Sequence, residues 1–472
     1  MRKTKIVCTI GPATESPEMI KKLILAGMNV ARLNTSHDTP DHHRERIRTI
    51  KRIRDELGIP VAILLDLSGP KLRTGTFNND NVSLHKGQKF SLTTENIIGD
   101  SNGVSVNYPL LPREVNPGDI ILLNDGKVKL KVLDTSEKSI TTEVLNDAEI
   151  THHRGINVPG IDLSINAVTK KDEVYIKLGV EEGVDYFALS FVRKPEDVKK
   201  AREIINSHGS NIPVVSKIET SQALSKITEI SEVSDGLMVA RGDLGVEIPV
   251  EEVPIAQKKI IKAGNRHRIP VITATQMLES MIENPTPTRA EATDISNAIL
   301  DGTDAIMLSA ETSIGNYPIE AVCVMNKTAI STERYLQENP HILHWTRRDA
   351  DADDHTDAIC RAAWDISESL KVKLIVSSTY SGHTAINVSG FRPRSTILAV
   401  TPNRRTYYQL SLVWGVLPLY QKIGSSIDEM VEIAGKKARE MELIKGGDHF
   451  IITAGVPLGV AHSTNMLKLE KA

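Results

Sequence analysis

Eight short apolar runs occur between residues 4 and 311, and nearly all of them end in side chains that can do chemistry. A strand with a purely structural role has no reason to carry charged or hydroxyl groups at its end. Seven of the runs end in such groups: Arg32, Asn34 and Ser36; Asp66; Ser190; Lys217 and Glu219; Arg241 and Asp243; Thr275; and Glu311. The pattern indicates an enzyme.

Two neighbouring runs carry the most specific combination. Lys217 and Glu219 are two residues apart, so their side chains point to the same face of a strand. Such a pair is costly to bury for structure alone, although a paired structural charge remains an alternative. Asp243 follows the next run between two glycines, in ARGDLG. Glu219 and Asp243 could share a divalent ion, since magnesium is usually held by one or two carboxylates with positions left for water and substrate oxygens.

Three further side chains suit an anionic substrate. Arg32 presents a planar fork for phosphate or carboxylate, and Arg73 offers a second one. Thr275 adds a hydroxyl after the seventh run. As single residues, the arginines could be surface charges and the threonine a strand-end cap. Together with the carboxylates, they predict a magnesium-dependent enzyme that acts on an anionic substrate, and a phosphorylated substrate is expected.

The segments between the runs have helical spacing, with apolar residues three or four apart. Examples are PEMIKKLILAG from Pro17, RERIRTIKRIRDELG from Arg44, PEDVKKAREIINSHG from Pro195 and EVPIAQKKIIKAGNRHR from Glu252. Strands alternating with helices predict parallel strands with helices packed outside. We therefore expect an α/β fold with a (β/α)8 barrel, in which the C-terminal ends of the strands converge on one site.

The helical spacing is interrupted once, over residues 70–167, where short alternating segments predict a small inserted β domain. Asp125 and Gly126 mark a hairpin turn within it. The barrel is thus expected to comprise residues 1–69 and 168–340. Because the insert leaves from the strand that carries Asp66, it would lie over the site as a hinged lid that excludes water. An immobile insertion is the alternative.

Residues 341–472 are expected to form a separate open α/β domain of about five strands. A helix from about Asp357 to Leu370 is followed by the runs LIVSS, TAINVSGF, TILAVTP, VLPLY and HFIITAG, with an amphipathic segment from Ile427 to Leu443. The segment STYSGHTA lies at a predicted helix N-terminus, where it could cradle a phosphate or simply cap the helix. Its donors are Ser378, Thr379, Ser381, Gly382 and Thr384.

Composition excludes several classes of partner. The 472-residue chain has a formal net charge of -3, which gives no reason to expect binding to nucleic acid or to an anionic membrane. Cys8, Cys323 and Cys360 show neither close pairing nor metal spacing, so a reduced, cytoplasmic location is expected. The apolar stretch near the N-terminus is too short for a signal peptide and is predicted to be the first strand.

Long, ordered segments of the chain closely resemble pyruvate kinase over essentially the whole length. They are KTKIVCTIGPA, ARLNTSH, LLDLSGPKLRTG, SKIET, MVARGDLGVEIP, ATQMLESM, PTPTRAEATDISNAILDGTDAIMLSAET and STYSGHTA. The resemblance implies transfer of the phosphoryl group of phosphoenolpyruvate to ADP, giving pyruvate and ATP. It also implies a magnesium cofactor, with manganese as a substitute, and a homotetramer.

The resemblance implies roles at the substrate. Lys217 would contact the migrating phosphoryl group and the enolate oxygen, while Glu219 and Asp243 would hold the magnesium. Gly242, Asp243 and Thr275 would receive the substrate carboxylate. The enolate must then gain a proton at carbon, and Thr275 and a water chain are equal candidates for its source.

Three more roles follow from the same resemblance. Arg32 would clamp the phosphate, whereas Asn34 and His37 would lie toward the nucleotide. The STYSGHTA loop would bind the phosphate of an allosteric effector, often a sugar phosphate or a nucleotide. His383 replaces a basic residue frequent in that loop, and Ile314 stands where a lysine is common, which leaves one nucleotide-side or interface contact unassigned.

One departure from the family pattern concerns potassium. Many members have glutamate in GPEIRTG and bind potassium near the residues that match Asn34, Ser36, Asp66 and the carbonyl of Leu67. This chain has Lys71 there, in GPKLRTG, and leucine at position 67 in place of the usual threonine. Because an ammonium group can supply the charge of a monovalent ion, we expect catalysis that does not require potassium.

Two other functions are compatible with parts of the sequence. Other magnesium and phosphoenolpyruvate barrel enzymes, such as an aldolase or a dikinase-like phosphotransferase, lack this combination of a β insert and a C-terminal α/β domain. A catalytically inactive barrel that senses a metabolite would be plausible if Lys217, Glu219 or Asp243 were missing, and all three are present.

Overall fold

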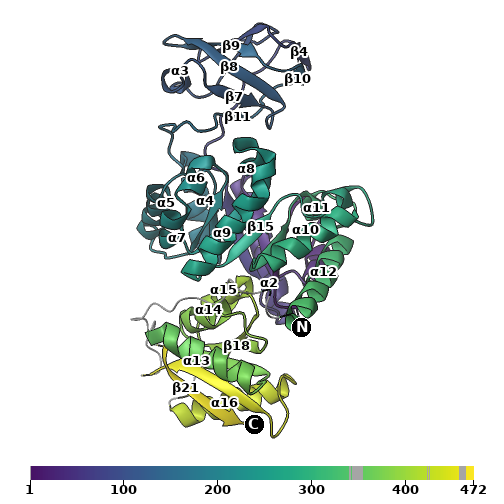
Figure 1. Cartoon of the computed structure of the whole chain (residues 1–472), viewed down its shortest axis with the longest axis vertical. Helices are drawn as coiled ribbons and strands as arrows, with labels where there is room; N and C mark the ends of the chain where they lie inside the picture. Colours follow the sequence, from purple (N-terminus) through teal and green to yellow (C-terminus); the bar gives the residue numbers. More distant parts are fainter. Residues whose placement is uncertain (1, 340–341, 343–354, 423, 425, 457–463) are drawn as a thin grey trace.

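The computed structural model describes residues 2–339, 342, 355–422, 424, 426–456 and 464–472. The molecule is elongated, with a mainly β part at one end, a barrel in the middle and an α/β part at the other end (Figure 1). The predicted boundary between residues 340 and 341 lies outside the described residues. Among the described helices, none combines the length and apolar character needed to cross a bilayer.

Eight parallel strands close into a barrel in the order β1, β16, β15, β14, β13, β12, β3, β2, which confirms the predicted (β/α)8 fold. The strands coincide with the eight apolar runs, because residues buried on both faces of a parallel strand are continuously apolar. Their bounds are β1 Lys5–Thr9, β2 Val30–Asn34, β3 Ala62–Leu67, β12 Tyr186–Leu189, β13 Val214–Ile218, β14 Gly236–Ala240, β15 Val271–Ala274 and β16 Ala305–Leu308.

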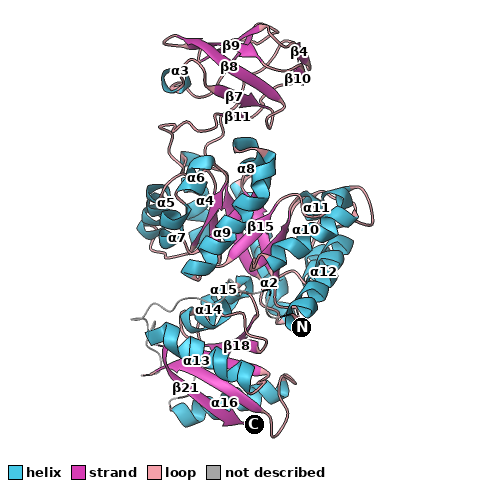
Figure 2. Ribbon diagram, viewed as in Figure 1, coloured by secondary structure: helices cyan, strands magenta, loops and turns pink. Residues whose placement is uncertain are grey.

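Helices surround the strands (Figure 2), and their ends follow from local side-chain chemistry. Ser16 accepts a hydrogen bond from the Met19 amide at the start of α1, and Gly27 ends that helix with φ of 124°. Thr288 and Glu291 form a capping box on α10. The main outer helices are α1 Pro17–Ala26, α2 Pro40–Leu57, α4 Lys170–Glu181, α5 Pro195–Ser207, α7 Ile227–Val233, α9 Val253–His267, α10 Arg289–Leu300 and α12 Pro318–Glu338.

The insert between β3 and α4 is a six-stranded sheet in the order β11, β7, β8, β9, β5, β6, with a two-stranded sheet of β10 and β4 beside it. The predicted hairpin at Asp125 and Gly126 is present, since β7 and β8 pair antiparallel and both residues have positive φ. The elements are β4 Val82–Leu84, β5 Lys89–Thr93, β6 Gly103–Ser105, α3 Leu111–Glu114, β7 Ile120–Leu123, β8 Val128–Thr135, β9 Ser139–Val144, β10 Ala148–Ile150 and β11 Ile156–Asn157.

The C-terminal part has a five-stranded sheet in the order β19, β18, β17, β20, β21. The run TAINVSGF is not a strand: it lies in helix α14, because its buried residues recur at helical spacing. The fifth strand is instead β21, which pairs antiparallel with β20. The elements are α13 His355–Ser369, β17 Leu374–Ser378, α14 His383–Gly390, β18 Thr396–Thr401, α15 Arg404–Gln409, β19 Val416–Tyr420, α16 Ile427–Glu440, β20 His449–Gly455 and β21 Thr464–Lys471.

The two ends of the barrel are covered by different parts of the chain. At the N-terminal ends of the strands, Leu412 of the C-terminal part is fully buried within the cluster of side chains that fills the barrel. Beside it, the Tyr186 hydroxyl donates to the carbonyl of Gln409 at 2.9 Å. The opposite end, where the strands finish in polar residues, faces the insert, so that end is the one available to a ligand.

Candidate active site

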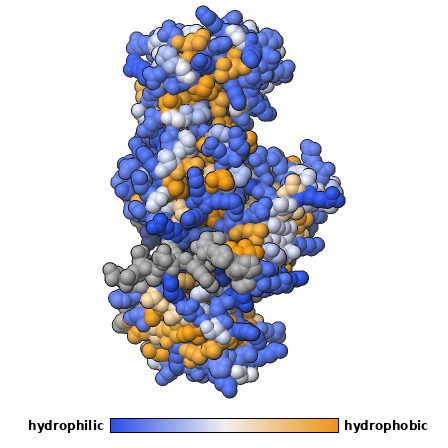
Figure 3. All heavy atoms as spheres, in the orientation of Figure 1, coloured by the Kyte–Doolittle hydropathy of each residue, from blue (hydrophilic) through white to orange (hydrophobic). Residues whose placement is uncertain are grey.

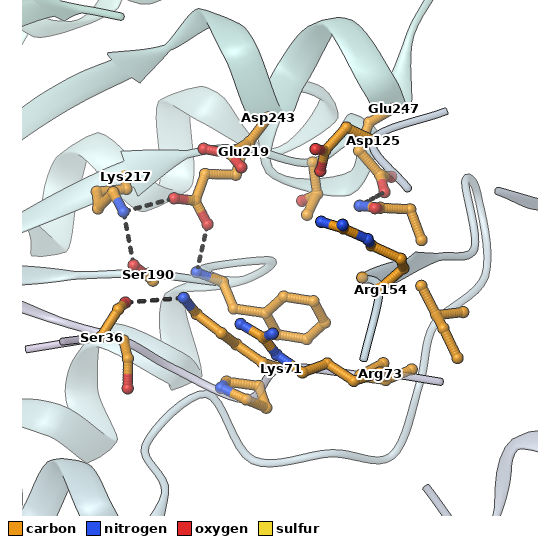
Figure 4. A pocket seen from close by; sticks show the side chains of 18 of the residues that line it. Ser36, Lys71, Arg73, Asp125, Arg154, Ser190, Lys217, Glu219, Asp243 and Glu247 are labelled. Carbon is orange, nitrogen blue, oxygen red and sulfur yellow. Dashed lines mark hydrogen bonds and ion pairs between the residues drawn. The ribbon is translucent and has the colours of Figure 1, made fainter. Parts of the chain in front are cut away.

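A cavity of about 460 Å³ lies between the C-terminal ends of the barrel strands and the insert. Figure 4 shows its side chains converging from both sides. Barrel strand ends and the loops just after them contribute Arg32, Asn34, Ser36, Ser68, Ser190, Phe191, Lys217, Glu219, Thr220, Asp243 and Glu247. The insert and its first connection contribute Pro70, Lys71, Leu72, Arg73, Asn124, Asp125, His153, Arg154, Gly155, Ile156 and Asn157.

Lys217 is the centre of the polar contacts. Its ammonium nitrogen lies 2.7 Å from Glu219 Oε1, and it donates to the Ser190 hydroxyl at 2.7 Å (Figure 4). It also lies 3.4 Å from Asp66 Oδ1. Burial alone would lower the pKa of Lys217, but the carboxylates of Asp66, Glu219 and Asp243 outweigh burial and raise it. A fixed, charged ammonium is therefore maintained in a site largely shielded from water.

Arg32 is held next to this group with part of its fork still facing the cavity. Its Nε donates to Asp66 Oδ2 at 2.7 Å, and its Nη1 donates to the Thr9 hydroxyl at 2.9 Å. Burial opposes ionisation of Asp66, but the Lys217 and Arg32 cations outweigh it and lower the pKa of that carboxyl. Asp66 thus stays ionised and orients both cations, although it does not itself line the cavity.

Three carboxylates crowd one side of the cavity. Burial and the neighbouring Asp243 charge raise the pKa of Glu219, against the opposing effect of Lys217. Burial raises the pKa of Glu247 too, and the charges of Glu219 and Asp243 add to that rise. A divalent cation would relieve this repulsion, so the residues present fit such an ion.

These carboxylates suit a divalent ion that also takes ligands from outside the protein. Within the described residues, no three histidine, cysteine or acidic side chains are grouped so that they could hold a metal alone. Glu219 Oε2 already accepts the Phe191 amide at 2.9 Å, and its Oε1 contacts Lys217. Two carboxylates completed by water and substrate oxygens match the coordination that magnesium prefers.

Lys71 reaches across the cavity to the end of β2. Its ammonium nitrogen donates to the Ser36 hydroxyl at 2.8 Å (Figure 4). Burial lowers the pKa of Lys71, and the nearby cations Arg73 and Lys217 lower it further, while Asp243 acts in the opposite direction. Ser36 is one of the residues expected to lie near a monovalent cation, and here a lysine ammonium contacts its oxygen.

Thr275 and Gly242 lie beside the cavity and do not line it. The Gly242 amide donates to Thr275 Oγ1 at 2.8 Å, and that hydroxyl donates to the carbonyl of Ala274 at 2.6 Å. Gly242 and Asp243 belong to the first turn of α8 (Arg241–Glu247). The first turn of α8, which carries Asp243, and the turn after β15 are therefore joined by a hydrogen bond.

The remaining predicted residues are more dispersed. Asn34 and Arg73 line the cavity, whereas His37 is exposed and Leu67 is buried in the barrel core, and neither lines it. Asn34 Oδ1 accepts the Ser36 amide at 3.1 Å, which shapes the end of β2.

The predicted effector loop is remote, at the junction of β17 and α14. Gly382 has φ of 90°, and its amide donates to Thr379 Oγ1 at 2.9 Å. Thr384 shares a hydrogen bond of 2.7 Å with the Thr464 hydroxyl. Ser378, Thr379 and Thr384 are buried, and Ser381 is half-buried. Part of the neighbouring last loop, residues 457–463, lies outside the described residues.

Several cavity residues were missed from the sequence, among them Phe191, Arg154, Asn157 and Glu247. Phe191 acts through its amide, a contact that no sequence pattern reveals. Arg154 and Asn157 come from the last segment of the insert, and Asn157 donates to Glu247 Oε1 at 3.1 Å. The available signal was a basic residue followed by glycine, in HHRGINVPG, just before the barrel resumes.

Comparison with known proteins gives one consistent result. Residues 1–322 match the family model of the pyruvate kinase barrel domain, and residues 357–470 match that of the pyruvate kinase alpha/beta domain. The chain is 51% identical to a pyruvate kinase of Thermotoga maritima over 100% of both chains. It is 47% identical to a pyruvate kinase of Staphylococcus aureus over 100% of this chain and 80% of that one.

A solved structure supports the same relationship. The crystal structure of a pyruvate kinase from Cryptosporidium parvum superposes with a TM-score of 0.93 at 35% identity, covering 100% of this chain and 96% of that chain. The barrel, its converging cations and carboxylates, and these relatives define a phosphotransferase enzyme. More specifically, the chain belongs to the pyruvate kinase family. Its substrates are accordingly phosphoenolpyruvate and ADP, and its product is pyruvate.

Proposed function

We propose that this pyruvate kinase needs magnesium but no potassium, because Lys71 supplies the monovalent charge. The observation that carries the proposal is the 2.8 Å hydrogen bond from the Lys71 ammonium to Ser36 Oγ. A cation is thereby already held at one of the oxygens expected to surround potassium, and Lys71 lies in the same cavity as Lys217 and Asp243. A further monovalent ion there would be repelled by it.

Magnesium would be held by Glu219 and Asp243, in keeping with its general use in the family, and manganese would substitute for it. When bound, the ion supplies positive charge close to the substrate oxygens. Lys217 stabilises the negative charge that develops on the enolate oxygen and contacts the migrating phosphoryl group. Arg32 clamps the phosphate, and Arg73, from the insert, adds a second guanidinium. Phosphoryl transfer depends mainly on such positioning and electrostatic stabilisation.

The substrate carboxylate would lie against Gly242, Asp243 and Thr275. The proton that the enolate gains at carbon comes from Thr275 or from a water chain beside it. Asn34 and His37 would lie toward the nucleotide, with His37 on the exposed side. The insert, which supplies Arg73 and Arg154 to the cavity, would close as a lid and exclude water.

The test measures pyruvate formation from phosphoenolpyruvate and ADP with magnesium, in tetramethylammonium buffer with and without potassium at constant ionic strength. Equal rates are expected for the wild type. Lys71→Glu should become strongly potassium-dependent, because it replaces the ammonium with a carboxylate that needs a counter-ion. Lys171→Glu makes the same charge change at a neighbouring residue outside the cavity lining and should stay independent of potassium. A wild-type rate that rises by orders of magnitude with potassium would refute the charge replacement.

The C-terminal part would bind a phosphorylated effector, either a sugar phosphate or a nucleotide, at Ser378, Thr379, Ser381, Gly382 and Thr384. Support comes from a left-handed Gly382 that leads into the N-terminus of α14, where amide groups favour an anion. Ser381→Glu should abolish the response to such effectors by repulsion. Ser369→Glu, an exposed position at the end of α13, makes the same charge change as a control. An unchanged response in Ser381→Glu would leave helix capping as the role of the loop.

The active form would be a homotetramer. Apolar side chains gather in patches over all three parts of the molecule on the face shown in Figure 3. Exposed apolar residues include Val250, Ile255 and Ile314, which are 74%, 54% and 62% exposed. Light scattering should give four times the 51.9 kDa chain mass. A monomeric mass with full activity would refute the tetramer.

A further inference from the structure

The turn after β15 has an unusual backbone. Thr275 and Gln276, two consecutive residues other than glycine, have φ of 67° and 54°. A β-branched residue rarely adopts this left-handed conformation, and it persists only where the surroundings hold it. Something in the structure must therefore fix the turn.

Arg241 makes contacts that can do so. Its Nη2 donates to the carbonyl of Thr275 at 2.6 Å and to that of Gln276 at 3.3 Å, and its Nε donates to the carbonyl of Ala274 at 3.2 Å. Its Nη1 lies 2.7 Å from a carboxylate oxygen of Asp294 on α10. The side chain of Arg241 is only 10% exposed, so these bonds are largely shielded from water.

This arrangement depends on the shape of a guanidinium group. One planar fork bonds to three consecutive carbonyl oxygens while a carboxylate fixes its orientation from the other side. A lysine has one nitrogen and could not reach all of these acceptors together. The elements α8, β15 and α10, which carry the fork, the turn and the carboxylate, are labelled in Figure 1.

The backbone turn after β15 also places the Thr275 hydroxyl next to the first turn of α8, which carries Asp243. With φ positive, Thr275 directs Oγ1 at the amide of Gly242, 2.8 Å away, and Gly242 precedes Asp243. Arg241 itself is the residue before Gly242, and it does not line the cavity. It thus connects two strand ends of the site without reaching the reacting atoms.

We propose that Arg241, oriented by Asp294, is a positioning residue that holds Thr275 and the Gly242 amide in place for the carboxylate end of the substrate. The inference rests on the proposed contact of Gly242 and Thr275 with that carboxylate. It predicts that loss of the fork disturbs phosphoenolpyruvate more than ADP.

The test is Arg241→Lys, which keeps the charge and removes the fork. We expect kcat/KM for phosphoenolpyruvate to fall about tenfold to a hundredfold, since small misplacements of a substrate-positioning group have effects of this size. KM for ADP should change less than about twofold, because the contacts of the fork are with the turn after β15 and with α10 and do not include Asn34 or His37. Inhibition by oxalate, a planar dianion shaped like the enolate of pyruvate, should weaken in parallel. Asp294→Asn should also lower kcat/KM for phosphoenolpyruvate and weaken oxalate inhibition, but by a smaller factor.

A matched control separates positioning from stability. Arg54 is similarly buried and paired, with Nη1 2.8 Å from Asp185 and donating to the carbonyl of Val61 at 2.6 Å, but it belongs to α2 and does not line the cavity. Arg54→Lys should lower the melting temperature and leave kcat/KM and oxalate inhibition unchanged. If both lysine variants lost activity only in proportion to their loss of stability, the inference would be overturned.

A second variant gives a rescue. Gln276→Gly introduces a residue that adopts positive φ without strain, so the turn needs less support. In the Arg241→Lys background it should recover part of kcat/KM for phosphoenolpyruvate, and absence of recovery would count against the inference. A wild type that is active only with potassium would refute the proposed function, whereas a wild type active without potassium together with an unimpaired Arg241→Lys would refute only the positioning role.

Discussion

The two ends of the barrel both bury cations, but they surround them differently. At the C-terminal end, Lys217 lies among Asp66, Glu219 and Asp243, which raise its pKa despite burial. Charged groups of both signs remain there beside a cavity of about 460 Å³. This end keeps its charges available to a ligand.

At the N-terminal end, two buried lysines bond to backbone oxygens. Lys3 Nζ donates to the carbonyls of Pro393 at 2.5 Å and Arg394 at 2.7 Å, and Lys5 Nζ donates to Val416 at 2.6 Å. Burial lowers the pKa of Lys3 to about 8 and, with the nearby Arg2 charge, that of Lys5 to about 7. At the C-terminal end, neighbouring carboxylates thus keep Lys217 charged for chemistry. At the N-terminal end, hydrogen bonds from Lys3 and Lys5 to carbonyl oxygens join the barrel to the C-terminal part.

Replacing the central lysine at each end should give the largest contrast. Lys217→Met should lower kcat about a thousandfold, because it removes a preorganised charge from the site where negative charge develops. Lys5→Met, at the other end, should retain kcat within about threefold, since its partner is a structural carbonyl. Steady-state pyruvate formation measures both. A decrease in kcat of less than tenfold in Lys217→Met would contradict the proposed difference between the two ends.

Removing the side chain that closes the N-terminal end should affect stability and leave the chemistry intact. Leu412→Ala should cost about 2–5 kcal/mol of unfolding free energy, because it leaves a cavity among the side chains that fill the barrel. Leu410→Ala, in the core of the C-terminal part, is a control of equal size. Only Leu412→Ala should speed hydrogen exchange in the barrel strands, and equal exchange in both variants would argue against the closure.

The sequence predicted the barrel and its polar strand ends well. Lys217, Glu219 and Asp243 could be placed together because parallel strands bring their C-terminal ends to one rim whatever the loops do. The C-terminal part was predicted less accurately. In TAINVSGF, Ala385 and Val388 are buried with helical spacing, but a short apolar run does not distinguish helix from strand.

Contacts set by tertiary structure could not be predicted. The carbonyl of Thr275, a residue with positive φ, bonds to Arg241, which lies 34 positions earlier. Leu412 enters the barrel only because the C-terminal part folds against it. Lys71 was predicted to replace a cation from its position in a motif, but its acceptor, Ser36, depends on how the insert approaches the barrel. Local patterns carry none of this information.

The N-terminal end also makes a pH prediction. The pKa of Lys5 is lowered to about 7 in the folded chain from 10.5, so between these values the unfolded chain binds more protons. Unfolding free energy should therefore rise as pH increases from 7 to 9, by up to about 1 kcal/mol per pH unit from this group. Lys3, lowered to about 8, contributes to the same trend from pH 8 upward. Denaturant unfolding at several pH values should show that the unfolding free energy of Lys5→Met rises less steeply with pH than that of the wild type. An equally steep rise would exclude Lys5 as the cause of the pH dependence.

The smallest effect concerns the hydrogen bond between Lys71 and Ser36. Ser36→Ala removes the acceptor and leaves the ammonium in the cavity, so activity should fall only about twofold to tenfold, which corresponds to the net contribution of about 0.5–1.5 kcal/mol of an ordinary hydrogen bond. Potassium should still be unnecessary, since the charge is retained. Ser68→Ala is the control, because that hydroxyl also lines the cavity but bonds to Asp172 at 3.3 Å. If Ser36→Ala acquired a potassium requirement as strong as that of Lys71→Glu, the position of the ammonium would matter as much as its charge. The function of a lysine at the C-terminal end would then depend on its hydrogen-bond acceptor, as it does for Lys3 and Lys5 at the N-terminal end.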